Sequence, residues 1–167
     1  MISNFFQLRR LLFLIGLFCV GLLAFGWYLQ TYQGQEPCPM CIVQRYCMVL
    51  VALIGFLGAA CPKVLGQKIA AGGMILIALA GLGTALRQSW LQWYPPEFFS
   101  CGRDPFSMVN NIGIAKVLPK VFAGHGDCTA VDWTFLGGSI ANWSFLVFSA
   151  SIIALLAALL CRRCTKK

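Results

Sequence analysis

The stretch Leu11–Leu29, LLFLIGLFCVGLLAFGWYL, decides the fold class of this chain. It follows the pair Arg9-Arg10, carries no charge, and is about as long as the 20 or so apolar residues that a helix needs to cross a bilayer. Three further stretches have a similar length and are nearly as apolar: Ile42–Ala60, Ile69–Leu86 and Trp143–Leu160. None shows the alternating pattern of a membrane barrel. The sequence therefore predicts an all-α membrane protein, a four-transmembrane-helix bundle formed by a single domain over residues 1–167.

The composition agrees with burial in lipid. Hydrophobic residues make up 59% of the chain and charged residues only 11%, whereas a soluble domain has roughly 25% charged residues. Such a chain has too few charges to cover a surface that faces water.

The positive charges predict the orientation of the helices. With a cytoplasmic N-terminus, the inner segments contain eight basic residues and no acidic one: Arg9, Arg10, Lys63, Lys68, Arg162, Arg163, Lys166 and Lys167. The rest of the chain has five basic and five acidic residues: Arg45, Arg87, Arg103, Lys116, Lys120, Glu36, Glu97, Asp104, Asp127 and Asp132. The net charge of +8 therefore indicates contact with anionic lipid headgroups and not with nucleic acid. We expect both termini to be cytoplasmic.

Two segments then remain outside, a short one over about residues 30–41 and a long one over about 87–142. The long segment contains a modestly apolar stretch, Met108–Phe122, interrupted by Gly113 and Pro119. This stretch suits a short amphipathic segment on the membrane surface, and a plain loop with scattered apolar residues is the alternative.

The nine cysteines fall into two groups. Four lie in the outer segments: Cys38, Cys41, Cys101 and Cys128. The other five lie inside helices or at the cytoplasmic boundary: Cys19, Cys47, Cys61, Cys161 and Cys164. Disulfides persist outside the bacterial inner membrane, while the cytosol keeps thiols reduced. An even set of four outside favours paired function there, and the five others suit packing residues or reduced thiols.

The sharpest motif is Glu36-Pro37-Cys38-Pro39-Met40-Cys41. Two cysteines in a CxxC arrangement can form a disulfide, and this arrangement favours the thiolate. Proline is tolerated only at or before the first turn of a helix, so the second helix is expected to begin here. Cys41 would then lie at a helix N-terminus, where the helix dipole also favours the thiolate.

Arg45 follows Cys41 by four residues and is expected on the same helix face, roughly 6 Å deeper. An arginine in the centre of a membrane helix costs about 2.5–3.5 kcal/mol on insertion scales. That cost suggests a use, which we take to be stabilisation of the Cys41 thiolate or neutralisation of a reduced cofactor beside it. The alternative is an arginine that snorkels to the outer headgroups.

Other interpretations of the outer cysteines predict different chemistry. Covalent haem attachment needs a histidine after the second cysteine, where this chain has Ile42. A zinc site would use Cys101 and Cys128 as further ligands, without tight ligand spacing. Cys101 and Cys128 suit either a structural disulfide or a pair that exchanges with a soluble partner and then with Cys38 and Cys41. A membrane scaffold or transporter subunit with structural disulfides, and a metal-binding membrane protein, remain the alternative functions.

The whole chain resembles the DsbB family of bacterial inner-membrane disulfide-forming oxidoreductases. The resemblance is carried by four stretches and one cysteine: Cys38-Pro39-Met40-Cys41-Ile42-Val43-Gln44-Arg45, Arg87-Gln88-Ser89-Trp90-Leu91-Gln92, Cys101, Gly126-Asp127-Cys128, and Trp133-Thr134-Phe135-Leu136-Gly137 followed by Trp143. One departure is Gln88, where a basic or aromatic residue would be less surprising. Arg87 and Gln88 are therefore left out of the predicted site.

The resemblance implies a function and a role for each site residue. The family reoxidises a periplasmic thiol oxidant of the DsbA type and passes the electrons to a membrane quinone, ubiquinone or menaquinone. By this resemblance Cys101 is the sulfur attacked by the reduced partner, and Cys128 is its mate in the loop. Cys38 exchanges with that pair, Cys41 reacts with the quinone, and Arg45 assists at the quinone.

Overall fold

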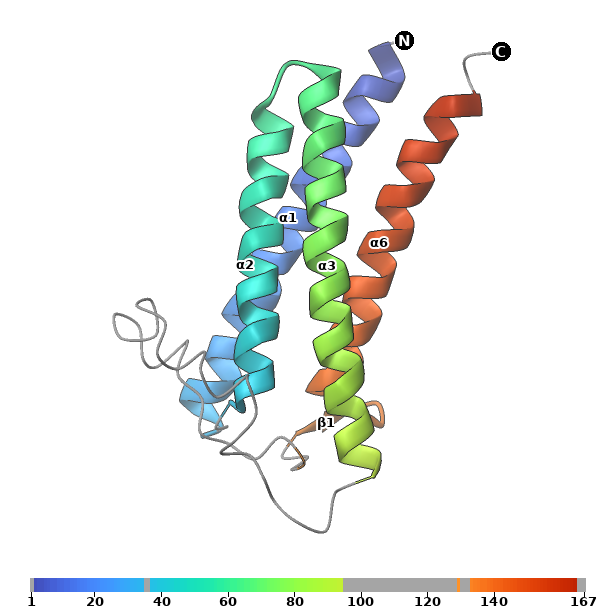
Figure 1. The fold of residues 1–167 in the computed structure, drawn as a ribbon. Helices are drawn as coiled ribbons and strands as arrows, with labels where there is room; N and C mark the ends of the chain where they lie inside the picture. Colours follow the sequence, from blue (N-terminus) through green and yellow to red (C-terminus); the bar gives the residue numbers. More distant parts are fainter. Residues whose placement is uncertain (1, 35–36, 95–128, 130–132, 165–167) are drawn as a thin grey trace.

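Four long helices form the molecule in the computed structural model, which describes residues 2–34, 37–94, 129 and 133–164. They are α1 (Ile2–Tyr32), α2 (Pro39–Ala60), α3 (Val64–Trp93) and α6 (Ile140–Cys164) (Figure 1). Each is long and apolar enough to cross a membrane. The predicted bundle of four membrane helices is thus confirmed. The segment Met108–Phe122, Cys101 and Cys128 lie outside the described residues.

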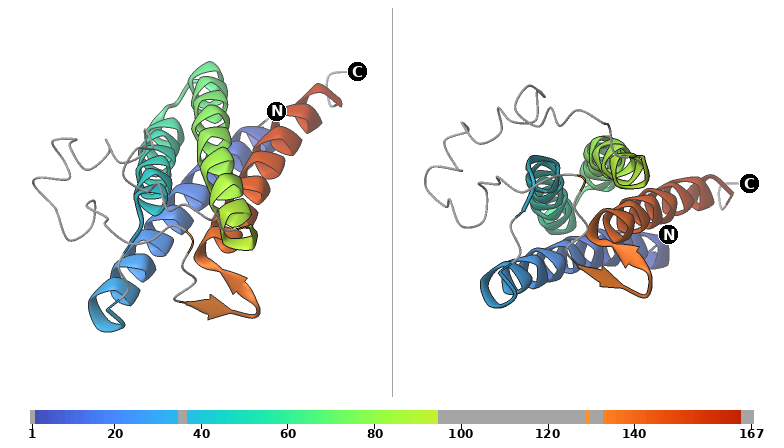
Figure 2. Two further views of the ribbon diagram at one scale, coloured as in Figure 1. Left: turned by 60° about the horizontal axis from the view of Figure 1, so that its bottom comes forward. Right: turned by 90° about the horizontal axis from the view of Figure 1, so that it is seen from below.

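The helices run up and down. The start of α1, the turn between α2 and α3, and the end of α6 lie at one end of the bundle (Figure 1). We call the other end, where α1 ends and α2 begins, the Cys38 end. Helix α1 packs mainly on α2, α2 on α3, and α3 on α6, whereas few contacts join α1 to α6. The two views of Figure 2 show this order of helices around the bundle.

The buried core is apolar, and so is much of the outer surface. Leu12, Val51, Met74 and Phe148 belong to a core to which all four helices contribute. Many other large apolar side chains are more than half exposed, among them Leu57, Leu65, Leu76 and Ile153. In water such a surface would be costly, at about 25 cal/mol per Å² of apolar area. Lipid removes that cost, which is why the exposed residues can be as hydrophobic as the core.

The helices extend beyond the apolar stretches quoted from the sequence, most clearly where α1 begins at Ile2 and α3 continues to Trp93. Helix α2 begins at Pro39, as the prolines around Cys38 predict. A two-stranded hairpin precedes α6, in a segment whose sequence predicts only loop. Strand β1 (Thr134–Phe135) pairs antiparallel with β2 (Gly138–Ser139). The two turn residues both have positive φ, 50° at Leu136 and 78° at Gly137, as two-residue hairpin turns of the I′ type require.

Candidate functional site

The Cys38–Cys41 pair lies at the first turn of α2. Cys38 is the N-cap residue, with extended backbone, and Pro39 takes the first helical position, where a missing N–H costs nothing. The Cys38 Sγ accepts a hydrogen bond from the Cys41 N–H, with 3.5 Å between N and Sγ. The Cys38 thiol in turn donates to the Cys41 Sγ at 3.2 Å. The two sulfurs therefore lie together at a helix N-terminus, as the motif predicts.

Gln88, on α3, contacts both sulfurs. Its Nε2 donates to the Cys41 Sγ at 3.1 Å and to the Cys38 Sγ at 3.3 Å. The side chain is only 3% exposed. The packing of α3 against α2 therefore places a carboxamide donor directly at the cysteine pair.

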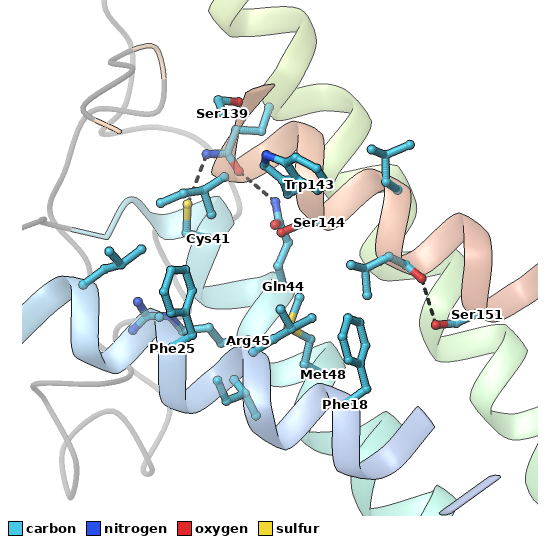
Figure 3. A pocket seen from close by; sticks show the side chains of 18 of the residues that line it. Phe18, Phe25, Cys41, Gln44, Arg45, Met48, Ser139, Trp143, Ser144 and Ser151 are labelled. Carbon is cyan, nitrogen blue, oxygen red and sulfur yellow. Dashed lines mark hydrogen bonds between the residues drawn. The ribbon is translucent and has the colours of Figure 1, made fainter. Parts of the chain in front are cut away.

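Gln44, one turn into α2, holds the other side of that carboxamide. Its Nε2 donates to the Gln88 Oε1 at 2.7 Å, and Gln44 is 2% exposed. In Figure 3 the side chains of Cys41 and Gln44 are linked through this amide by two dashed lines. Buried polar groups need partners, and here each glutamine supplies one to the other.

Arg45 extends from α2 toward α1. Its Nη1 donates to the Gln30 Oε1 at 2.9 Å. The guanidinium of Arg45, which is predicted to act at the cysteines, is therefore held in position by a side chain near the C-terminal end of α1. Both Arg45 and Cys41 line the same cavity.

That cavity, of about 1100 Å³, lies where α1 and α6 make few contacts. Its apolar walls come largely from these two helices, with Phe18 and Phe25 on α1 and Trp143 near the start of α6 (Figure 3). Cys41, Gln44 and Arg45 line it from α2. Ligand sites are typically apolar concavities of 300–1,000 Å³ with a few polar groups that fix orientation. A flat apolar ring with polar substituents and an apolar tail fits this lining.

Hydrogen bonds between α3 and the start of α6 close the Cys38 end of the bundle. The Ser89 Oγ donates to the Asn142 Oδ1 at 2.8 Å, and the Ser139 Oγ donates to the Gln92 Oε1 at 2.7 Å. The Ser139 Oγ also accepts from the Asn142 N–H at 3.4 Å, which makes Ser139 the N-cap of α6. These contacts keep α6, and with it one wall of the cavity, in place.

Aromatic side chains cover the same end of the cavity. The rings of Trp133 and Phe135 stack at 6.0 Å, and Trp133 also meets Phe25 of α1 edge-on at 6.0 Å. The Trp143 Nε1–H donates to the Phe135 carbonyl at 3.1 Å. The hairpin is therefore tied to both α1 and α6 beside the cysteine pair.

The structure brings together three of the five predicted site residues, Cys38, Cys41 and Arg45. Cys101 and Cys128 lie outside the described residues, so their pairing stays a prediction. Gln88 is left out of the predicted site because a basic or aromatic residue would be less surprising after Arg87, but the structure places its carboxamide on both sulfurs. The available signal was a pair of glutamines at membrane depth, since polar residues there pair with one another. Among the residues that the structure describes, no three metal-ligating side chains form a group able to hold a metal ion.

The fold and site define a multi-pass membrane protein with a CxxC pair capping a helix beside an apolar cavity. A family model described as disulfide bond formation protein DsbB matches residues 8–159. The chain therefore belongs to the DsbB family, and its role is disulfide bond formation as a disulfide oxidoreductase.

Three relatives, each named disulfide bond formation protein B, illustrate the similarity. The one from Polaromonas naphthalenivorans strain CJ2 is 52% identical over 95% of this chain and 94% of its own length. The one from Albidiferax ferrireducens is 51% identical over 95% of this chain and 91% of its own. The one from Acidovorax sp. strain JS42 is 54% identical over 90% of this chain and 87% of its own.

Proposed function

We propose that this protein oxidises a periplasmic dithiol protein of the DsbA type and passes the electrons to a membrane quinone. In this proposal the protein lies in the bacterial inner membrane with both termini cytoplasmic. The observation that carries the proposal is the shared cavity, which places the Cys41 thiol at the wall of an apolar site open to a lipid-soluble oxidant.

The roles of the four outer cysteines are those that the family resemblance implies. Cys101 and Cys128 exchange first with the reduced partner, which leaves the partner oxidised and the loop pair reduced. The loop pair then reduces the Cys38–Cys41 disulfide by a second exchange, in which a thiolate attacks and a thiolate leaves. Each exchange moves two electrons and conserves the number of disulfides.

A quinone fits the cavity because the apolar walls suit an isoprenoid chain and the polar side chains gather at the Cys38 end. A quinone held there would supply an acceptor for the two electrons and two protons of the Cys38–Cys41 dithiol. The residues of this chain that would hold it are Arg45, as a fixed cation at the ring, and Gln44 and Trp143, which line the same end. The guanidinium position set by Gln30 keeps that cation in the site before any negative charge develops.

The test of this proposal is turnover of purified protein with a reduced DsbA-type partner and a quinone. Serine at Cys38, Cys41, Cys101 or Cys128 should each abolish oxidation of the partner. Simultaneous serine at Cys19, Cys47, Cys61, Cys161 and Cys164 should leave most of the activity. A five-fold variant that folds and is inactive would show that the division of cysteines is wrong. A wild-type protein that oxidises no partner with any quinone would favour a scaffold or a metal-binding role.

A further inference from the structure

Gln44 and Gln88 form a buried chain of hydrogen bonds that ends on the sulfurs of Cys38 and Cys41. The Gln88 Nε2 donates to both sulfurs, and the Gln88 Oε1 accepts from Gln44. From these contacts we infer that Gln88 is a further catalytic residue, which stabilises the reduced form of the Cys38–Cys41 pair. Gln44 is the positioning residue that fixes its amide. The inference rests on the proposed function and adds to it a determinant of the redox equilibrium.

The orientation of the Gln88 amide follows from its partners. If the amide were turned around, its NH₂ group would face the NH₂ group of Gln44, and its oxygen would face the two sulfurs. Both glutamines are almost fully buried, so water cannot satisfy the donors left over. A buried donor without a partner costs about 1–3 kcal/mol, which holds Gln88 with its donors on the sulfurs.

The donors favour the reduced state because of what each sulfur can accept. A thiolate is a charged acceptor, and hydrogen bonds to charged groups are worth about twice those between neutral groups. A disulfide sulfur is a much weaker acceptor. Gln88 therefore lowers the free energy of the reduced pair more than that of the disulfide. A redox pair whose reduced form is stabilised is the stronger oxidant, and this helps the pair take electrons from the loop cysteines.

The effect differs from that of Arg45, since Gln88 is neutral. A carboxamide at this depth adds a directed donor without a second buried charge, which would be costly in a membrane helix. Gln88 thus supplies directed hydrogen bonds to the sulfurs, whereas Arg45, held by Gln30, supplies a charge that the sulfurs and the cavity both feel.

The experiment measures the equilibrium of the Cys38–Cys41 pair with glutathione, with no quinone and no partner present. The full chain carries serine at Cys101 and Cys128, and the redox state of the peptide holding Cys38 and Cys41 is read by alkylation and mass spectrometry. Two glutathione molecules break the Cys38–Cys41 bond, give up two electrons and form one glutathione disulfide. Their two thiol protons pass to the cysteine sulfurs, or one of them to water where Cys41 is a thiolate.

Gln88→Met keeps the length of the side chain and removes the donors. The equilibrium constant for reduction should fall about tenfold, the equivalent of about 1.4 kcal/mol for one hydrogen bond to a charged sulfur. Gln67→Met is the matched control, because Gln67 is also a fully buried glutamine of α3 but donates to the Cys61 carbonyl at 3.1 Å. Its equilibrium constant should equal that of the wild-type background.

Gln44 is tested by a double-mutant cycle. Gln44→Met should shift the equilibrium in the same direction by about threefold, since an amide that is free to turn spends part of its time with its oxygen on the sulfurs. The double variant should match Gln88→Met alone, because Gln44 acts only through Gln88. Additive losses would overturn the positioning role of Gln44.

An unchanged equilibrium in folded Gln88→Met, or an equal shift in Gln67→Met, would overturn the inference. If Gln88→Met does not fold, Gln88→Ala removes the donors from a smaller side chain and must show the same shift. A wild-type pair that glutathione cannot reduce at any ratio would contradict the proposed function itself, so the two failures are distinguishable.

Discussion

At the scale of the residue, the free-energy cost of placing the Arg45 guanidinium in a membrane helix is offset by its surroundings. Burial of a guanidinium within the range of a membrane helix is unfavourable, but Gln30 of α1 accepts from it at 2.9 Å and the side chain lines a cavity near the end of the helix. The guanidinium is also close enough to Cys38 and Cys41 to attract their thiolates, so the same cation can act on the sulfurs and on a ligand in the cavity.

Arg45→Ala should weaken use of quinone more than it weakens exchange with the protein partner. Reduction of a quinone develops negative charge in a setting of low dielectric constant, where a fixed cation matters more than in water. Arg45→Lys should recover part of the loss, because it keeps the charge and loses the planar fork of donors. The measurement is oxidation of reduced partner across a quinone titration, beside single-turnover exchange without quinone. Unchanged quinone KM and kcat in Arg45→Ala would leave snorkelling to the headgroups as its role.

At the scale of the element, sequence patterns predicted the helices well and their contacts poorly. An uncharged run such as Leu11–Leu29 has one stable form in lipid, since a helix alone satisfies its backbone there. The prolines around Cys38 likewise place the start of α2. The contact of Gln88 with the sulfurs instead joins the end of α3 to the start of α2, residues that are far apart in the sequence. It depends on how the two helices pack against each other. No local pattern contains that register, and the short hairpin before α6 was missed because its strands have two residues each.

The start of α6 offers a test of this packing. Ser139→Ala removes the N-cap of α6 and the bond to Gln92, so thermal unfolding in detergent should begin several degrees lower, for a loss of about 1–2 kcal/mol. Ser151→Ala is the control, because the Ser151 Oγ bonds only to the Val147 carbonyl within the same helix in the described contacts. Equal melting of the two variants would mean that the cap does not hold α6 to α3.

At the scale of the whole molecule, the described ends of the chain and the α2–α3 turn share one end of the bundle (Figure 1). Six of the eight basic residues of the predicted inner segments belong to described helices or turns at that same end: Arg9, Arg10, Lys63, Lys68, Arg162 and Arg163. The positive-inside rule assigns that end to the cytoplasm. A reporter enzyme that works only in the cytoplasm should therefore be active when it is fused after Lys167, and one that works only in the periplasm should be inactive. Activity of a reporter that works only in the periplasm would reverse the orientation and, with it, the outer location of Cys38 and Cys41.

If the proposed quinone binds in the cavity, the length of the cavity predicts how the quinone KM depends on the length of the isoprenoid tail. Leu14, Phe18, Leu22 and Phe25 line it from one face of α1, and residues as far along as Ala154 line it from α6. From Phe25 to Leu14 a helix rises about 16 Å, which is the extended length of about three isoprenyl units. The quinone KM should therefore fall as the tail grows to about three units and change little beyond that.

A bulky side chain inside the cavity should remove this dependence on the tail. Ala154→Phe fills the part of the cavity far from Cys41, so long-tailed quinones should lose their advantage while a quinone with one isoprenyl unit is unaffected. Ala157→Phe is the matched control, because Ala157 is exposed on the same helix and is not part of the lining. Steady-state oxidation of a reduced partner across tail lengths gives the comparison. If the KM does not depend on tail length in the wild type, or depends on it equally in both variants, the tail does not run between α1 and α6, and the apolar walls then serve only the ring.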